Sequence, residues 1–179
     1  MNIMLFGMSN VGKTTIGKIL ADKLGYDFYD LDLEIKKKFN MTMEEFVNRY
    51  RVLSKRDMIR GQLIGEILQR DGNKVIAVTQ MYYSRYFMPY IEQDGNLAIE
   101  LQDTVENIFN RLVFSDSNDQ ICDDSVEYRN AHKDYYMQEI EEDYEFYKKS
   151  FSKIGNKFFI NNDSPERAAE RLIEQYQLK

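Results

Sequence analysis

The chain has 179 residues, of which 43% are hydrophobic, and its formal net charge is −6. This length supports one sizeable hydrophobic core but leaves little room for a second, so we expect a single domain over residues 1–179. The negative charge argues against a general nucleic-acid-binding protein, because such a protein needs a basic face to neutralise phosphates.

The first predicted elements are a strand, a glycine loop and a helix. Ile3 to Phe6 is a short apolar run typical of a buried strand, and apolar residues recur at helical spacing from Ile16 to Leu24. Between them, the stretch GMSNVGKTT fills every fixed position of the phosphate-binding pattern GxxxxGK[ST]. Strand, loop and helix follow in the order that this pattern requires, which predicts a P-loop.

This loop predicts a nucleotide site. Its glycines allow the backbone N–H groups, together with the helix N-terminus, to form a cradle for phosphate oxygens. Lys13 supplies a positive charge for the β- and γ-phosphates, and the Thr14 hydroxyl is placed to ligate Mg²⁺. We therefore expect ATP and Mg²⁺ to bind here. The expected ATP-binding residues of the loop are Gly7, Ser9, Asn10, Val11, Gly12, Lys13, Thr14 and Thr15.

A second strand is predicted from Tyr26 to Tyr29, and it is followed by Asp30 and Asp32. Ligands bind at this carboxyl edge of a parallel sheet. Asp30 is expected to orient Mg²⁺ or its water, and Asp32 to orient, or accept a proton from, a substrate hydroxyl that attacks the γ-phosphate. The alternative is that Asp30 caps the next helix and that Asp32 only favours its first turn. Beside a P-loop, the functional interpretation is preferred.

The runs GMSNVGKTTIG and LADKLGYDFYDLD, which lie within residues 7–32, resemble the opening third of shikimate kinases. These enzymes belong to the nucleoside-monophosphate-kinase-like group of P-loop proteins. In that family the first aspartate of the DxD pair is associated with Mg²⁺ and the second with the acceptor hydroxyls. The resemblance therefore implies these roles for Asp30 and Asp32, and it implies a sheet with the strand order 2-3-1-4-5.

Residues 33–70 are predicted to be helical and to form the substrate-binding insertion. In the family, this region carries a GExxFRxxE-like segment whose arginine holds the shikimate carboxylate. The nearest counterpart here is LSKRD, residues 53–57. Lys55, Arg56 and Arg60 are candidates to bind an anionic substrate, and the alternative is that they are solvated charges on a helix.

A third strand is predicted from Lys74 to Val78. In shikimate kinases the corresponding strand ends in a glycine triplet that lies against shikimate. Here the bulky residues Gln80, Met81 and Tyr82 occupy those positions. A ligand cannot approach this backbone in the same way, which argues against shikimate itself as the acceptor.

The fourth strand is predicted from Leu97 to Leu101, followed by a helix from about Thr104. Arg111 falls where related kinases place an arginine near the adenine base. Its alternative role is to supply a favourable charge at the end of that helix.

Residues 113–133 show no clear periodicity and are expected to include a lid over the nucleotide. Shikimate kinases carry a lid arginine in an RPLL-like segment, which is not present here, so Arg129 is the candidate. From Ser115 to Glu145 there are eleven acidic residues against two cations, Arg129 and Lys133. Such a lid would repel ATP unless it folds away or meets a cationic ligand.

The last elements are two helices and a strand. Aromatic residues recur at helical spacing from Asp134 to Phe151, a stripe more typical of a core than of a binding surface. The family places a second carboxylate-binding arginine four residues before the tyrosine of an RxxxY-like pattern, and counting back from Tyr147 gives Asp143. A fifth strand is predicted at residues 158–160, and Ser164 with the following proline begins a terminal helix.

Two further observations concern the setting of the protein. Its one cysteine, Cys122, excludes an internal disulfide, and with His132 it supplies no ligand set of the zinc type. No apolar stretch approaches membrane-spanning length, and the N-terminus shows no basic leader. We therefore expect a cytoplasmic protein with no membrane partner.

Strands alternate with helices along the chain, which predicts a three-layer α/β/α sandwich around a five-stranded parallel sheet, the P-loop NTPase fold. The preferred function is an ATP- and Mg²⁺-dependent kinase in which Lys13 and Asp32 act on a small-molecule hydroxyl. The resemblance implies a shikimate kinase-like enzyme, and its missing motifs imply a changed acceptor. The alternative is a nucleotide-binding protein that uses its acidic lid as a regulatory or partner surface. A nucleoside-monophosphate kinase is less favoured, because the lid lacks clustered arginines.

Overall fold

The structure is a computed structural model, and it describes residues 1–114, 118, 120 and 126–179. Five parallel strands form one sheet in the order β2-β3-β1-β4-β5, which confirms the predicted order 2-3-1-4-5. The strands are β1 (Asn2–Gly7), β2 (Asp27–Asp30), β3 (Lys74–Ala77), β4 (Asn96–Gln102) and β5 (Asn156–Phe159). The inner strands β1 and β3 are buried along nearly their whole length, as their continuous apolar runs predict.

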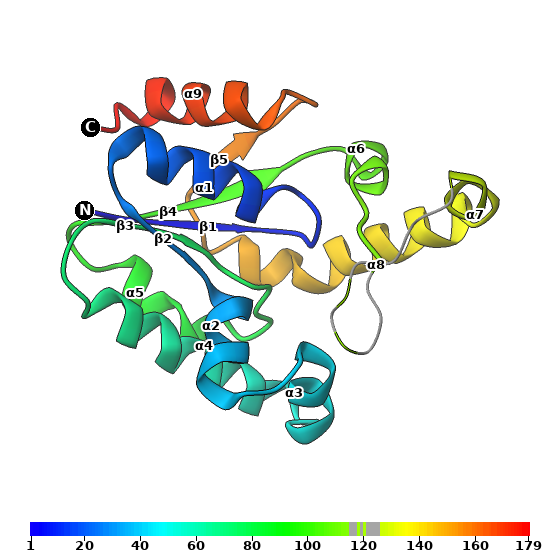
Figure 1. Cartoon of the computed structure of the whole chain (residues 1–179), viewed down its shortest axis with the longest axis horizontal. Coiled ribbons are helices and arrows are strands. Elements are labelled where there is room, and N and C mark those ends of the chain that lie inside the picture. The colour runs from blue at the N-terminus through cyan, green and yellow to red at the C-terminus, as the bar shows by residue number, and fades with distance from the viewer. Residues whose placement is uncertain (115–117, 119, 121–125) are drawn as a thin grey trace.

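Helices cover both faces of this sheet. They are α1 (Lys13–Leu24), α2 (Leu31–Phe39), α3 (Met43–Arg49), α4 (Leu53–Leu68), α5 (Met88–Ile91), α6 (Val105–Asn110), α7 (Val126–Ala131), α8 (Lys133–Phe151) and α9 (Pro165–Tyr176). Helices α1 and α9 lie on one face, and α4, α5 and α8 lie on the other (Figure 1). This arrangement confirms the predicted three-layer sandwich.

Local side-chain signals explain where several helices begin. Thr42 and Glu45 form a capping box at the start of α3, in which each side chain bonds the other residue's backbone N–H. The Ser164 hydroxyl accepts a hydrogen bond from the backbone N–H of Arg167, and Pro165 occupies the first turn of α9. These are the start signals that the sequence predicts for the terminal helix.

The region between β3 and β4 departs from the predicted pattern. Here the chain forms a short 3₁₀ helix, Ser84–Tyr86, and the four-residue helix α5, neither of which the sequence pattern predicts. Elements this short do not complete the apolar periodicity on which helix prediction depends. No helix in the described parts of the chain is long and apolar enough to span a bilayer.

The sheet brings the polar segments to one edge. Because all five strands are parallel, the loop after β1, the end of β2 and the segment after β3 meet at their carboxyl ends. Both chain termini lie at the opposite edge (Figure 1). The candidate functional residues are therefore gathered at a single edge of the fold.

Candidate active site

The glycine loop lies between β1 and α1, where the sequence predicts a P-loop. Gly7 has a φ of 139° and Gly12 a φ of 113°, conformations that residues with side chains rarely adopt. A Cβ at Gly7 would also lie 2.5 Å from the Leu101 carbonyl oxygen of β4. Both glycines are therefore required by the backbone path of the loop.

Lys13 reaches back over this loop. Its Nζ atom donates hydrogen bonds to the carbonyl oxygens of Gly7, at 2.8 Å, and Met8, at 2.7 Å. Burial lowers the pKa of Lys13 to about 8, although the nearby carboxylates of Asp32 and Asp30 oppose this shift. The ammonium is thus poorly solvated, which favours a negatively charged ligand beside it.

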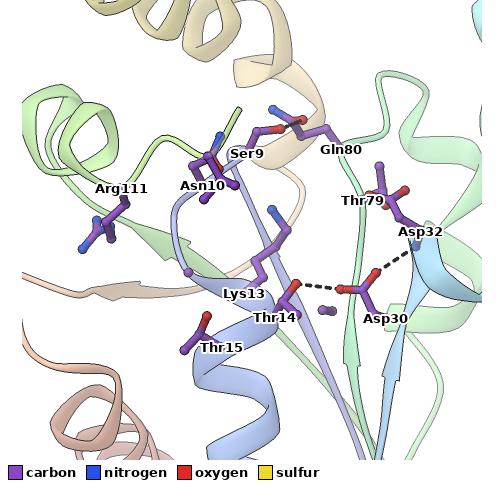
Figure 2. A pocket seen from close by; sticks show the side chains of 13 residues that line it. Ser9, Asn10, Lys13, Thr14, Thr15, Asp30, Asp32, Thr79, Gln80 and Arg111 are labelled. Atoms are coloured by element: carbon purple, nitrogen blue, oxygen red, sulfur yellow. Dashed lines mark hydrogen bonds between the residues drawn. The ribbon is translucent and has the colours of Figure 1, made fainter. Parts of the chain in front are cut away.

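Asp30 and Thr14 form a pair of oxygen ligands suited to a magnesium ion. The Thr14 hydroxyl donates to Oδ2 of Asp30 at 2.6 Å, while Oδ1 of Asp30 accepts from the backbone N–H groups of Asp32 and Leu33 at 3.0 and 3.2 Å (Figure 2). Asp30 is therefore the N-cap of α2 and also faces the P-loop. The capping and metal-binding interpretations are compatible, since they use different oxygens of one carboxylate. The other coordination positions of the Mg²⁺ ion would be filled by water and phosphate oxygens.

Asp32 lies in the first turn of α2 and points to the end of β3. Its Oδ1 atom accepts a hydrogen bond from the Thr79 hydroxyl at 2.5 Å. Burial raises the pKa of Asp32, and the hydrogen bond from Thr79 and the charge of Arg60 partly oppose this rise. A carboxylate with a raised pKa and a fixed orientation is suited to interact with a hydroxyl group.

These side chains surround one cavity of about 570 Å³, a volume typical of small-molecule sites. The lining residues are Ser9, Asn10, Gly12, Lys13, Thr14, Thr15, Asp30, Asp32, Ala77, Thr79, Gln80, Arg111 and Val113. Most of them are the predicted ATP- and metal-binding residues (Figure 2). Of the predicted loop residues, Gly7 and Val11 do not line the cavity, and the Val11 side chain is fully buried below the loop.

Arg111 lies at the opposite end of the cavity from Asp32 in Figure 2. It is the C-cap residue of α6, and its Nη2 atom donates to Oδ2 of the buried Asp103. Burial tends to raise the pKa of Asp103, but hydrogen bonds from Asn107 and Arg111 outweigh this effect and hold the pKa below its usual value. Asp103 is therefore an anion that fixes Arg111 in the wall of the cavity.

Of the three predicted substrate-binding cations, Arg60 lies nearest to the site. Its buried guanidinium donates through Nη1 to Oδ1 of Asp57 at 3.3 Å and to the Gln80 carbonyl oxygen at 3.2 Å. Lys55 is exposed, and the Nε atom of Arg56 is buried without a hydrogen-bond partner. None of the three cations lines the cavity beside the P-loop.

Arg129, the predicted lid arginine, lies on α7. Its Nη1 atom donates to the Asn110 carbonyl oxygen at 3.0 Å, and the side chain does not line the cavity. Part of the predicted lid, residues 115–117, 119 and 121–125, lies outside the described residues, and so does Cys122.

The aromatic stripe of α8 packs as a core stripe, as its spacing predicts. Tyr136, Tyr144 and Tyr147 are partly buried against the hydrophobic core, and the Tyr144 hydroxyl donates to the Asp103 carbonyl oxygen at 3.0 Å. Asp143 lies on the same helix, near the Gln80 side chain. Desolvation and the adjacent charge of Glu139 raise the pKa of Asp143.

The sequence interpretation assigned no hydrogen-bonding role to three polar residues at the site, although it named Gln80 for its bulk. Thr79 bonds Asp32, Asp57 pairs with Arg60, and the Gln80 side chain accepts from the Ser9 hydroxyl at 2.7 Å. Thr79 directly follows a predicted buried strand, which is the signal that would have placed it beside Gln80 at the ligand edge. Asp57 gives no such signal, because a polar residue on a helix is usually exposed.

The chain is similar to known shikimate kinases over nearly its whole length. A family model described as shikimate kinase matches residues 9–177. A shikimate kinase of Bacillus subtilis (strain 168) is 28% identical over 176 residues, which cover 97% of this chain and 87% of that protein. A shikimate kinase of Bacillus pumilus (strain SAFR-032) is 59% identical over 44 residues, but the match spans only 25% of this chain and 24% of that protein.

Solved structures agree on the fold. The shikimate kinase of Bacteroides thetaiotaomicron superposes with a TM-score of 0.75 at 22% identity, with 99% of this chain and 98% of that chain covered. A shikimate kinase of Acinetobacter baumannii, solved in complex with shikimate, gives a TM-score of 0.70 at 20% identity, with 99% and 95% covered. At these identities the likeness shows the fold, whereas the family match extends over nearly the whole sequence. The chain therefore belongs to the shikimate kinase family of P-loop kinases.

Proposed function

We propose that this protein is a kinase that transfers the γ-phosphate of ATP, with Mg²⁺, to a hydroxyl group of a small molecule. The observation that carries this proposal is the convergence of Lys13, Thr14, Asp30 and Asp32 on one cavity. A phosphate-binding loop alone would support nucleotide binding only. The buried carboxylate of Asp32 across the cavity adds a group suited to an acceptor hydroxyl.

The roles of the residues follow from their charges and positions. The amides of the glycine loop and the ammonium of Lys13 hold the phosphates, and Arg111 lies where it can contact the base. Thr14 and Asp30 are the oxygen ligands for Mg²⁺, which would neutralise charge on the phosphates when bound. Asp32 orients the acceptor hydroxyl or takes its proton, and Thr79 holds Asp32 in position. For Arg129 to act as the lid arginine, α7 has to move toward the bound phosphates.

The acceptor is proposed to differ from shikimate. Gln80, Met81 and Tyr82 fill the positions at the end of β3, and the Gln80 side chain projects into the cavity wall. Arg60 is already neutralised by Asp57, so it adds little net charge for a carboxylate. Lys55 and Arg56 are the remaining cations of the predicted set, and both belong to α4.

The test is ATP consumption with Mg²⁺ in the presence and absence of shikimate, with Lys13→Ala as the blank. We expect wild-type protein to bind ATP and to show little or no increase in turnover with shikimate, because of the bulk at the end of β3. Shikimate-dependent turnover would contradict the changed acceptor and would indicate that α4 supplies the carboxylate-binding cations.

A second candidate function is nucleotide binding without efficient transfer. It is favoured by the position of Arg129, whose guanidinium is hydrogen-bonded to Asn110 outside the cavity. Under this alternative the acidic segment around α7 and α8 serves as a partner surface. ATP binding without transfer to any acceptor in a broad panel of hydroxyl compounds would support it, whereas transfer that is lost in Asp32→Asn would exclude it.

A further inference from the structure

Gln80 connects the phosphate loop to α4. Its Oε1 atom accepts a hydrogen bond from the Ser9 hydroxyl at 2.7 Å (Figure 2). Its Nε2 atom also lies 3.8 Å from the Met8 sulfur. Its carbonyl oxygen accepts from Arg60 of α4 at 3.2 Å, and the Asp143 carboxylate of α8 lies near its side chain.

The chemistry of these contacts requires a side-chain amide. Ser9 offers a hydroxyl donor and needs an acceptor, whereas the Asp143 carboxylate is an acceptor and needs a donor. A glutamine supplies both in one planar group. A carboxylate at position 80 would face Asp143 with a like charge, and an apolar side chain would leave the Ser9 hydroxyl without this acceptor.

Gln80 lines one of two cavities that meet at the phosphate loop. It lines the cavity that holds Lys13 and Asp32. A second cavity, of about 190 Å³, lies beside it and is bordered by Ser9, Asn10 and Asp143. Ser9 and Asn10 line both spaces, so the amide of Gln80 is bonded at the boundary between them.

We propose that Gln80 is a positioning residue for phosphoryl transfer: its amide holds the Ser9 side of the phosphate loop at a fixed place relative to the segment after β3, where Arg60 in turn bonds the Gln80 backbone. This inference rests on the proposed kinase function. Gln80 holds the loop whose amides bind the phosphates, and the neighbouring Thr79 holds Asp32, which faces the acceptor hydroxyl. Residues 79 and 80 together therefore determine the relative positions of the phosphoryl group and its acceptor. Transfer is sensitive to such placement, because a displacement of about 1 Å can cost on the order of 100-fold in rate.

The first test is Gln80→Ala, measured as kcat and as KM for ATP. Most of the ATP-binding groups do not depend on Gln80, so KM is expected to change by less than about threefold while kcat falls by about 10- to 100-fold. Gln138→Ala is the matched control, since Gln138 lies exposed on α8 and bonds only Glu142 among the contacts described for its side chain. It is expected to behave like wild type.

The second test exchanges the amide and the carboxylate between positions 80 and 143. Gln80→Glu places two carboxylates together and is expected to lower kcat at least as much as Gln80→Ala. Combining Gln80→Glu with Asp143→Asn restores one donor facing one acceptor while Ser9 keeps its acceptor. The double variant is expected to recover kcat to within about threefold of wild type. Asp143→Asn alone keeps an acceptor for Gln80 and is expected to remain active.

The outcomes separate this inference from the proposed function. If the wild-type protein shows no phosphoryl transfer, both the proposed function and this inference are contradicted. Wild-type transfer that Gln80→Ala leaves unchanged overturns the inference alone. The same holds if KM for ATP rises in parallel with the loss of kcat, or if the double variant is no better than Gln80→Glu.

Discussion

The ammonium of Lys13 is bonded to the carbonyl oxygens of its own loop, and burial lowers its pKa to about 8. A pKa near 8 means that a substantial fraction of Lys13 is neutral at pH 8 before ligand binds. Phosphate groups favour the charged form, so ATP binding should take up about half a proton at pH 8 and almost none at pH 6.5.

Calorimetric titration in two buffers of different ionisation enthalpy measures this uptake. Lys13→Arg is the control, because an arginine stays protonated at both pH values. Binding heats at pH 8 that do not depend on the buffer would contradict the lowered pKa.

The bond between Thr79 and Asp32 predicts a pH effect on activity. Burial raises the pKa of Asp32, and the Thr79 hydrogen bond opposes this rise. If ionised Asp32 is the active form, kcat/KM for the acceptor falls as the pH drops through this raised pKa. Thr79→Val removes the opposing bond, so the acidic limb of the profile should move to higher pH, whereas Thr79→Ser should leave it in place. A limb that is the same in all three proteins would exclude this role of Thr79.

At this scale, the sequence predicts residues whose roles depend on local spacing. Lys13 and Thr14 occupy fixed positions of a known loop, and Asp30 follows the strand that brings it there. The contact between Ser9 and Gln80 joins residues 71 positions apart, and the Thr79 to Asp32 contact joins residues 47 apart. Such pairs depend on how three strands are arranged in the folded protein. A single sequence does not predict which side chains meet in that arrangement.

At the scale of elements, Asp30 belongs to the start of α2 and to the metal site. Asparagine caps a helix about as well as aspartate, so Asp30→Asn should change the free energy of unfolding by less than about 0.5 kcal/mol, whereas Asp30→Ala should cost about 0.5–2 kcal/mol. Both variants should lose the strengthening of ATP binding by Mg²⁺, since both lack the anionic ligand.

Denaturant unfolding and ATP titrations with and without Mg²⁺ measure the two effects separately. A wild-type response to Mg²⁺ in Asp30→Asn would contradict the assignment of Asp30 as a metal ligand. Equal stability of all three proteins would show that the cap contributes little.

Elements with strong periodicity or capping signals are the ones that the sequence predicts. The helix predicted from about Asp134 to Phe151 is α8, which starts at Lys133, and the terminal helix begins at its predicted proline. Helix α5 has only four residues, which is too few to show the recurring apolar positions from which a helix is predicted. The strand order, in contrast, came from the family resemblance, because no local pattern orders parallel strands.

At the scale of the whole molecule, the buried pair of Asp57 and Arg60 joins α4 to the segment after β3. Asp57 is fully buried, and its second oxygen accepts from the Tyr83 backbone N–H at 2.9 Å. Asp57→Ala leaves the guanidinium of Arg60 buried without this partner, which should cost about 3–5 kcal/mol of unfolding free energy.

Thermal and denaturant unfolding measure this loss. The control is Glu145→Ala, which removes a partner of Lys148 at the same i,i+3 spacing from an exposed pair and should change stability little. Equal stability of the two variants would contradict a structural role for the buried pair. Because Arg60 also bonds Gln80, the same variant is expected to disturb the cleft.

The central claim is transfer of a phosphoryl group from ATP to a small-molecule hydroxyl at the cavity bounded by Lys13 and Asp32. The most direct measurement is ³¹P nuclear magnetic resonance of ATP, Mg²⁺ and a panel of hydroxyl compounds that includes shikimate, with wild-type protein and Asp32→Asn. The account predicts a new phosphomonoester signal with wild type that falls by about 100-fold or more in rate in Asp32→Asn. ATP binding with no phosphomonoester from any compound, or transfer that Asp32→Asn leaves unchanged, would contradict it.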